Sequence, residues 1–162
     1  MSLENIAKKR KGELVEILEN MDVQQRISML FKLGESGNTE AYEVLRKEAQ
    51  GDLRHQALIA MAEVSYSATM DIVVSLLKKE REDASRKKNK NIVGYIFCER
   101  IDRYGHDEFY KDLEALRPLD PSVKNVMYSA LEEVLKLKLT DVELTEDERE
   151  PYLAKAREIL GI

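Results

Sequence analysis

Four segments of the chain repeat the same pattern of apolar residues, and this repetition constrains the fold more than any other feature. In each segment an apolar residue is followed by two more, three and four positions later. The four sets are Ile27, Leu30 and Phe31; Ala57, Ala60 and Met61; Val93, Ile96 and Phe97; and Met127, Ala130 and Leu131. Successive sets lie 30, 36 and 34 residues apart. The spacing predicts a repeated helical hairpin, because stacked neighbours bury apolar faces that a lone hairpin leaves exposed.

The helical period continues outside these sets. Apolar residues recur at intervals of three and four along most of the chain, and no segment favours a long strand. In the helix expected after Asp22, the apolar residues are Val23, Ile27, Leu30, Phe31 and Gly34. We therefore predict an all-α chain of about nine helices. A capping helix is expected in residues 1–21, and one hairpin in each of 22–51, 52–84, 85–118 and 119–162.

Capping residues mark several of the expected helix starts. Asp22 with Gln25, and Thr145 with Glu148, have the spacing of a capping box. Further N-caps are expected at Asn38, Asp52 and Asp120, the last of which stands directly before Pro121. Pro151 would bend a helix that begins at Thr145, so a start near Asp147 eases the conflict.

Three stretches resemble the HEAT-like repeat family. "DPSVKNVMYSALEEV" (120–134) is similar to the first helix of such a repeat, with an Asp-Pro turn before a hydrophobe and a basic residue. "DLRHQALIAMAEV" (52–64) matches it without the proline and places Arg54 where Lys124 stands. "SGNTEAYEVLRKEAQGD" (36–52) is similar to the turn and second helix of the short variety. The resemblance implies a right-handed α-α superhelix that forms a single solenoid domain over 1–162.

The repeats depart from the family at two points. They are shorter than the roughly 40 residues of full-size HEAT repeats. The basic position of the motif is Gln24 in the first copy and only arguably Lys90 in the third. Residues 1–21 show no resemblance, and the first and third copies therefore depend more on periodicity than on motif.

The resemblance also implies a function. Second helices of such repeats line a concave face that holds another macromolecule, which favours a non-enzymatic scaffold or adaptor with a protein partner. The partner-binding residues expected on that face are Tyr42, Arg46, Lys78, Tyr110 and Lys111. At the basic position of the repeat, Arg54 and Lys124 are implied to form a structural ladder with acidic residues of adjacent repeats.

No constellation of residues indicates catalysis. The chain has two histidines, His55 and His106, and one cysteine, Cys98, which together do not give a zinc set of the usual spacing. Iron-dependent HEAT-like hydroxylases carry His-Glu pairs, whereas here Gln56 and Asp107 follow the histidines. We therefore expect no catalytic residue, no metal and no cofactor, and Cys98 is expected to be a buried, inert thiol.

Two charged segments offer alternatives. Arg86, Lys87, Lys88 and Lys90 form a basic cluster that would suit the phosphates of nucleic acid. Preceding acids and a net charge of −5 favour an exposed loop or helix start instead. The acidic segment Thr140–Glu150 is expected to be an exposed connection between the last two helices, with docking of a basic partner as its alternative.

Several expectations concern location. No apolar run is long enough to span a bilayer, and the N-terminal residues lack the apolar region of a secretory signal. A single cysteine cannot form an intrachain disulfide. These features favour a cytoplasmic protein that does not bind membranes.

Overall fold

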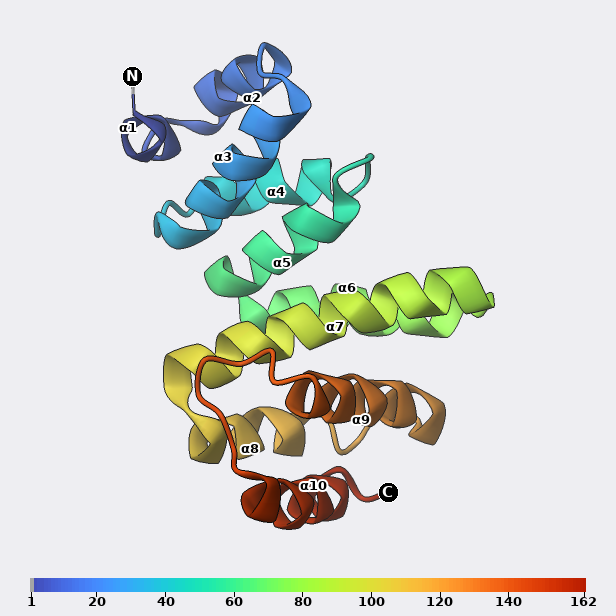
Figure 1. Cartoon of the computed structure of the whole chain (residues 1–162). Helices are drawn as coiled ribbons and strands as arrows, with labels where there is room; N and C mark the ends of the chain where they lie inside the picture. The colour runs from blue at the N-terminus through green and yellow to red at the C-terminus, as the bar shows by residue number, and fades with distance from the viewer. Residues whose placement is uncertain (1) are drawn as a thin grey trace. The chain divides into compact units, whose positions relative to one another are not determined.

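The computed structural model describes residues 2–162, which form ten α-helices and no strand (Figure 1). Helices account for 76% of the chain, so the all-α prediction is confirmed. The tenth helix comes from the N-terminal segment, which forms two short helices where one is expected. Those two are α1 (Leu3–Ala7) and α2 (Lys11–Glu19).

The chain groups into two compact units, Met1–Val73 and Val74–Ile162. The boundary lies inside α6 (Tyr66–Lys79). The single domain over 1–162 that the resemblance implies stays a prediction. Within residues 2–162, no helix combines the length and the apolar character that crossing a membrane requires.

In the first unit, alternate helices pack on one another. After α1 and α2 come α3 (Val23–Glu35), α4 (Ala41–Glu48) and α5 (Arg54–Val64). Helix α3 packs against both α1 and α5, while α2 packs against α4. Helix α4 also contacts α3 and α5. Each helix of the N-terminal pair therefore packs on one helix of the next pair, α1 on α3 and α2 on α4.

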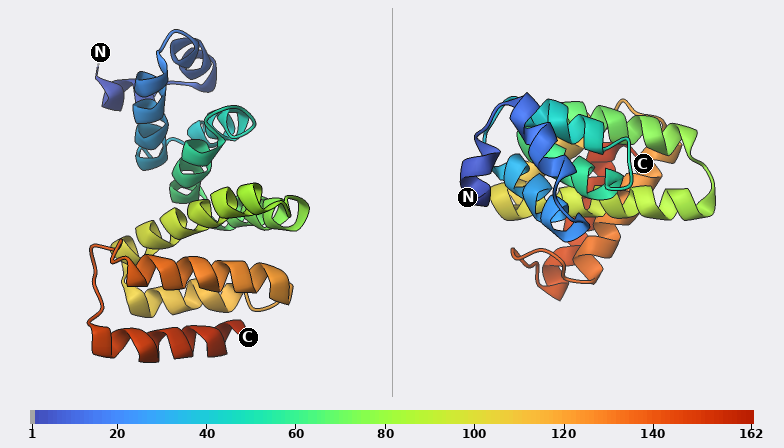
Figure 2. Two further views of the ribbon diagram at one scale, coloured as in Figure 1. Left: turned by 45° about the vertical axis from the view of Figure 1, so that its right-hand side comes forward. Right: turned by 90° about the horizontal axis from the view of Figure 1, so that it is seen from above.

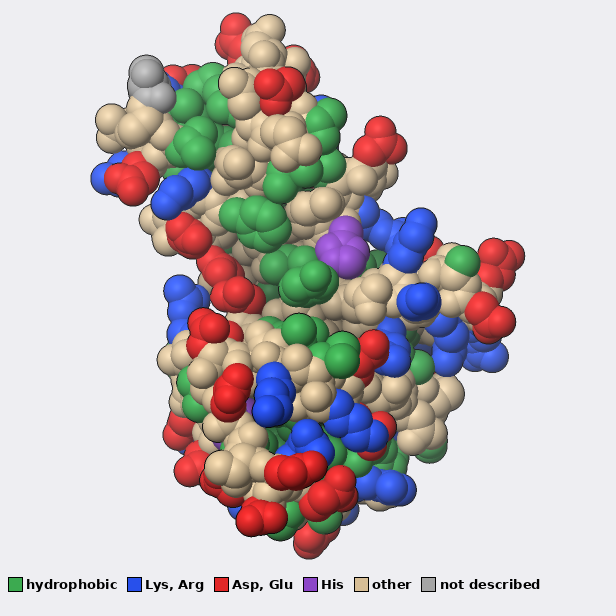
Figure 3. Space-filling model, in the orientation of Figure 1, with side chains coloured by type: hydrophobic (Ala, Val, Ile, Leu, Met, Phe, Trp, Pro, Cys, Tyr) green, Lys and Arg blue, Asp and Glu red, His purple; other side chains and the backbone are tan. Residues whose placement is uncertain are grey.

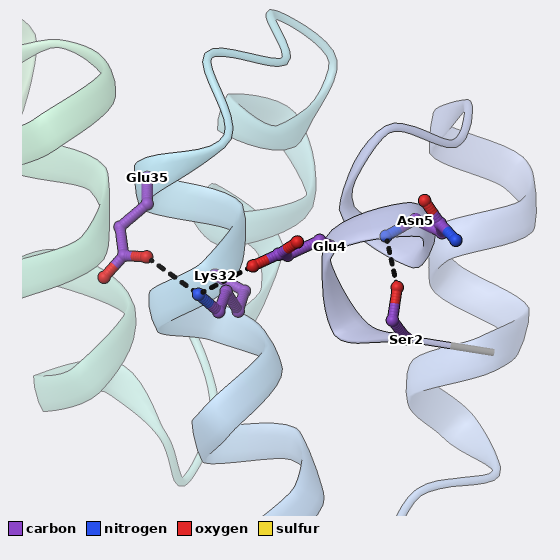
Figure 4. Close-up of polar contacts among 5 residues, drawn as sticks. All are labelled: Ser2, Glu4, Asn5, Lys32 and Glu35. Atoms are coloured by element: carbon purple, nitrogen blue, oxygen red, sulfur yellow. Dashed lines mark hydrogen bonds and ion pairs between the residues drawn. The ribbon is translucent and has the colours of Figure 1, made fainter.

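Polar contacts join α1 to α3. The Lys32 Nζ lies 3.3 Å from a Glu35 carboxylate oxygen on its own helix and 3.9 Å from Glu4 on α1 (Figure 4). The Ser2 hydroxyl accepts a hydrogen bond from the Asn5 amide at 3.2 Å and caps α1. These exposed ion pairs contribute little stability, and α1 depends mainly on the burial of its apolar residues.

The buried face of α3 differs from the predicted one. This helix buries Met29, Leu30, Leu33 and Gly34, whereas Phe31 is 37% exposed and Val23 is also exposed. The cause is a close approach to α5. A Cβ atom at Gly34 would lie 2.7 Å from the carbonyl oxygen of Ala60, so only glycine fits at this contact. Packing at Gly34 turns Leu33 inward and Phe31 outward.

Two of the expected N-caps are wrong. Helix α4 begins at Ala41 after Glu40, and α5 begins at Arg54 after Leu53, so neither Asn38 nor Asp52 is the capping residue. Asn38 instead joins two turns. Its side-chain amide donates to the carbonyl oxygens of Ala7 at 2.9 Å and of Lys9 at 2.8 Å. The capping box of Asp22 with Gln25 is confirmed, with hydrogen bonds of 2.8 and 3.1 Å.

The second unit contains the rest of α6 and four further helices. These are α7 (Asp83–Tyr104), α8 (His106–Ala115), α9 (Pro121–Lys136) and α10 (Glu146–Leu160). Helix α7 packs against α8 and α9, and α10 packs against α8 and α9 (Figure 2). Phe97 of α7 meets Phe109 of α8 edge to face, with ring centroids 5.0 Å apart.

An arginine links the two helices of one pair in each unit. Arg26 of α3 donates to both carboxylate oxygens of Glu48 on α4, at 2.9 and 2.7 Å. In the same way Arg100 of α7 donates to both oxygens of Asp112 on α8, at 2.9 and 3.0 Å. All four side chains are partly buried, so these bidentate pairs fix the geometry of each hairpin more firmly than exposed pairs would.

Most residues of the four repeated apolar sets are buried, whereas Ile27 is half-buried and Phe31 is exposed. Seven residues that we expect between paired helices are all buried: Ala57, Ala60, Met61, Phe97, Met127, Ala130 and Leu131. The capping box of Thr145 with Glu148 is also present, and α10 begins at Glu146, one residue from the expected start. Pro151 lies inside α10, and its missing amide leaves one helical hydrogen bond unmade.

Candidate binding groove between α7 and α9

Two adjoining hollows run along α7 and α9, and we call them together the α7–α9 groove. One has a volume of about 580 Å³ and is lined by the first half of α7. The other has a volume of about 490 Å³ and is lined by the second half of α7 and the segment after α9. Lys90, Asn91 and Glu133 line both hollows, so the two form one continuous surface.

The groove exists because short side chains line it on the α9 side. At its floor α7 and α9 meet closely, since a Cβ atom at Gly94 would lie 3.3 Å from Cγ2 of Val134. Four of the α9 residues that line the hollows have small or short side chains: Ser122, Asn125, Ser129 and Ala130. Two helices that meet through such residues leave a depression between their outer side chains.

The first half of the groove is basic. Arg86, Lys87 and Lys90 line it from α7, and neutral donors line it from both helices: Asn91, Ser122, Asn125 and Ser129. Glu133 is the one carboxylate among the described residues of this hollow, and it lies 2.8 Å from the Lys90 Nζ. After this pairing, two positive charges remain. Figure 3 shows basic and acidic side chains crowded over the end of the helices where α7 begins.

The second half of the groove is apolar in the middle and acidic at its far end. Tyr95, Leu137 and Leu139 are 56%, 60% and 55% exposed, and because all three line this hollow they form one exposed apolar strip. The carboxylates that line this half are Glu99, Asp102, Glu133 and Asp141. The groove therefore runs from positive, through apolar, to negative.

Hydrogen bonds hold the segment that forms one wall of the groove. One carboxylate oxygen of Asp102 accepts from the amides of Asp141 at 2.7 Å and Val142 at 3.1 Å. The His106 ring Nε2 donates to the Val142 carbonyl oxygen at 2.8 Å. Thr140 is buried, so the acidic segment that we expect to be exposed is anchored at its first residue. Residues 141–143 and 145–148 are exposed, as predicted, but the connection is shorter than predicted because α10 begins at Glu146.

Cys98 lies at the floor of the apolar half. It is 8% exposed, so the predicted burial is confirmed. Burial, together with the nearby carboxylates of Asp102, Glu99 and Asp141, raises the pKa of the thiol to about 12. The thiolate is the reactive form of cysteine. At neutral pH this side chain is therefore a protonated thiol with apolar character.

The four predicted cations occupy the first two turns of α7, as the expected helix start implies. Arg86 reaches back toward the Leu77 carbonyl oxygen at 3.5 Å, and Lys90 pairs with Glu133. Lys87 is exposed and lines the groove. Lys88 is exposed and is not among the described residues that line it. The basic cluster is therefore divided between the groove and another face of α7.

The five residues expected on the second-helix face belong to both units. Tyr42 and Arg46 lie on α4 of the first unit; Lys78 on α6, and Tyr110 and Lys111 on α8, belong to the second. None of them is among the described residues that line the α7–α9 groove.

Contacts within the second unit engage three of these side chains. The Tyr110 ring stacks on Tyr152 of α10 at 4.8 Å, with the Lys155 Nζ 4.3 Å from its centroid. The Lys111 Nζ lies 3.0 Å from Glu108 on the same helix. The Lys78 Nζ lies 3.9 Å from Asp120. Tyr110 therefore packs within the protein, and less of its ring is available to a partner.

The basic position of the repeat motif differs from the family pattern at Lys124. The resemblance implies pairing with acids, but the Lys124 Nζ donates to two carbonyl oxygens, those of Arg117 at 3.0 Å and Leu160 at 2.9 Å. Carbonyl groups at the end of a helix carry partial negative charge, which explains why a cation is stable there. The structural role is therefore supported, with different partners.

The two histidines lie in different units, His55 on α5 and His106 at the start of α8. Burial, and then the charge of Arg54, lower the pKa of His55. Within residues 2–162, no group of three or more His, Cys, Asp and Glu side chains is arranged to hold a metal ion.

Sequence reasoning missed most of the groove. It identified the cations of α7 but not the opposite wall on α9, nor Tyr95 as part of an apolar strip. One signal was available, because Leu137 and Leu139 are large apolar residues in a polar stretch that follows a helix.

No protein-family model matches the chain, and neither a curated protein nor a solved structure matches it. The chemistry of the groove is therefore the basis for a functional proposal.

Proposed function

We propose that the chain is a non-enzymatic HEAT-like scaffold and that a segment of a protein partner lies in the α7–α9 groove. The packing of successive helix pairs supports stacked hairpins. In the first unit α1 packs on α3 and α2 on α4, and in the second unit α7 packs on α9 and α8 on α10. The proposed site is formed by first helices of the expected repeats and differs from the second-helix face. Binding of this kind needs no metal and no cofactor.

One observation carries the proposal, namely that exposed apolar side chains lie between charges of opposite sign. Covering Tyr95, Leu137 and Leu139 would remove a large apolar area from water, and interfaces are enriched in such residues at their centre. A nucleic acid fits less well, because its phosphates would meet the carboxylates of Glu99 and Asp102. A protein segment can carry an anionic group at one end, an apolar one in the middle and a cation at the other.

The length of the groove sets the length of that segment. Lys87 and Asp102 are 15 positions apart on α7, which corresponds to about 22 Å along a helix. An extended segment spans this distance with about seven residues. We therefore expect recognition of a short linear segment.

A peptide selection tests the proposal. Random peptides of about nine residues, displayed on phage, would be selected on the immobilised full chain. We expect enrichment of peptides with acidic, apolar and basic positions in that order, read in one direction or the other. The affinity of the selected peptides should fall when Tyr95→Ser shortens the apolar strip.

Tyr104→Ser is the matched control, because Tyr104 is also an exposed tyrosine of α7 but is not among the described residues that line the groove. Selected peptides that bind both variants equally well would contradict the proposed site. Selection of no peptide, together with tight binding of an oligonucleotide, would contradict a protein-binding function.

A further inference from the structure

The basic half of the groove carries more positive charge than one ordinary acidic side chain can neutralise. Arg86, Lys87 and Lys90 face a single carboxylate, that of Glu133, among the described residues that line this hollow. A partner's aspartate or glutamate would supply one further negative charge. A phosphorylated serine or threonine supplies about −1.5 to −2 and three strong acceptor oxygens. The charge of the hollow therefore matches a phosphate monoester better than a carboxylate.

The arrangement of donors agrees with this match. Arg86, Lys87, Lys90 and Asn91 form one stripe on α7, and Ser122, Asn125 and Ser129 form a facing stripe on α9 at helical spacing. Cations thus come from one wall, and hydroxyl and amide donors from the other. Ser122 lies in the first turn of α9, where unpaired backbone amides add positive potential.

We propose that this half of the groove is a receptor for a phosphoserine or phosphothreonine in the docked segment. The inference depends on the proposed function, because the phosphorylated residue is placed at one end of the same segment. The Lys90–Glu133 ion pair is partly exposed, and such pairs contribute little stability. Lys90 can therefore turn toward a phosphate at small cost.

A phosphorylated protein segment fits better than other sources of phosphate. A free phosphate would leave the apolar strip uncovered. A nucleic acid would continue with further phosphates toward Glu99, Asp102 and Asp141, which repel them. Only a segment with a single phosphate, then apolar residues and then a cation satisfies the whole groove.

The spacing of these features can be estimated from α7. Tyr95 is eight positions from Lys87, which is about 12 Å and corresponds to three or four extended residues. The carboxylates Glu99 and Asp102 lie about 18 to 22 Å from Lys87, which corresponds to about five to seven extended residues. A phosphorylated residue should therefore be followed or preceded by an apolar residue and then by lysine or arginine at these distances.

Two oriented peptide libraries test the inference on the full chain. Both contain peptides of about nine residues, with phosphoserine fixed at either end in one library and serine fixed at the same positions in the other. We expect retention of the phosphoserine library, with apolar residues and then lysine or arginine enriched at the stated spacing. Individual peptides from the enriched pool would then be measured by fluorescence anisotropy.

Two lysine variants separate a pocket from general charge. Lys87→Ser should weaken binding of a selected phosphopeptide by about tenfold, since it removes one charged hydrogen bond. Lys88→Ser is the matched control and should leave affinity nearly unchanged, because Lys88 is exposed next to Lys87 and is not among the described lining residues. Equal losses in the two variants would overturn the inference.

The remaining outcomes are equally decisive. If the serine peptides bind as tightly as the phosphoserine peptides, the phosphate receptor is wrong while the protein-binding groove stands. If neither library is retained, both proposals fail. Competition by inorganic phosphate at the same concentration as a phosphopeptide would show an anion pocket without a docked segment. Tighter binding of a single-stranded oligonucleotide than of any phosphopeptide would indicate a nucleic-acid site instead.

Discussion

The ammonium group of Lys124 lies 2.9 Å from the main-chain carbonyl oxygen of Leu160, the last residue of α10. It also donates to the carbonyl oxygen of Arg117 at 3.0 Å, in the turn before α9. The side chain is only 7% exposed. One cation of α9 therefore holds both the end of α10 and the turn before α9, and its hydrogen bond to Leu160 is buried.

Replacement of Lys124 by methionine should destabilise the second unit. The change keeps most of the side-chain volume but leaves two carbonyl groups without their charged donor, at a cost of roughly 2 to 3 kcal/mol. Urea unfolding monitored by circular dichroism would measure the difference. Lys136→Met on the exposed side of α9 is the control and should change stability by less than about 0.5 kcal/mol. Equal changes in stability in the two variants would show that the hydrogen bonds of Lys124 do not stabilise the second unit.

Two glycine-to-alanine changes should act in opposite directions. Gly34→Ala places a Cβ atom 2.7 Å from the Ala60 carbonyl oxygen, so α3 and α5 must move apart. We expect a loss of about 1 to 3 kcal/mol. Gly12→Ala on α2 meets nothing within 4 Å and should instead raise stability by up to about 1 kcal/mol. Thermal unfolding of both variants tests the pair, and a stabilised Gly34→Ala would refute close contact at Ala60.

Replacement of Lys138 by glycine should stabilise the end of α9. Lys138 has a φ of 54°, and it is the one non-glycine residue with positive φ in residues 2–162. Its backbone closes the helix end, with the Leu139 amide donating to the Val134 carbonyl oxygen at 3.1 Å. Glycine adopts this conformation without strain, and we expect a gain of roughly 0.5 to 1 kcal/mol. The same change at Lys136, the last residue of α9, should instead lower stability by up to about 1 kcal/mol, because this residue has helical backbone. A loss of stability at both positions would contradict the argument.

Stability should depend on the ionisation of Cys98 at alkaline pH. Burial raises the pKa of this thiol from 9.0 to about 12 in the folded chain. Above pH 9 the unfolded chain loses the thiol proton while the folded chain keeps it, so the free energy of unfolding falls as pH rises toward 12. The contribution approaches about 1.4 kcal/mol per pH unit. Cys98→Ala removes it, so denaturant unfolding of the two proteins between pH 8 and 10 should diverge. If the unfolding free energies of the two proteins depend on pH in the same way, the pKa of the thiol is not raised in the folded chain.

The sequence predicted the all-α class and many of the buried residues, because the helical spacing of apolar residues indicates both. On α5 residues 57–62 are all apolar, and Ala57, Ala60 and Met61 are buried as expected, together with Leu58 and Ala62. On α3 two overlapping faces have helical spacing, one through Phe31 and one through Leu33. The choice between them depends on contact with a neighbouring helix, which a pattern within one helix does not contain.

The groove was harder to predict because its walls are far apart in the sequence. The cations of α7 are visible as a cluster, but the facing donors Ser122 and Ser129 are unremarkable in isolation. They meet Lys87 and Lys90 only after α7 and α9 pack side by side. The wall formed by Leu139 also depends on a tertiary contact, the hydrogen bonds that Asp102 accepts from Asp141 and Val142.

The hydrogen bonds of the Asn38 side chain affect local unfolding of the first unit. Its amide holds the carbonyl groups of Ala7 and Lys9, so the turn between α1 and α2 is tied to the turn before α4. Short helices such as α1 are marginal without tertiary contacts. Local opening of α1 and α2 therefore involves breaking these two hydrogen bonds, and the amide hydrogens of both helices should exchange with solvent as one group, faster than those of α3 and α5.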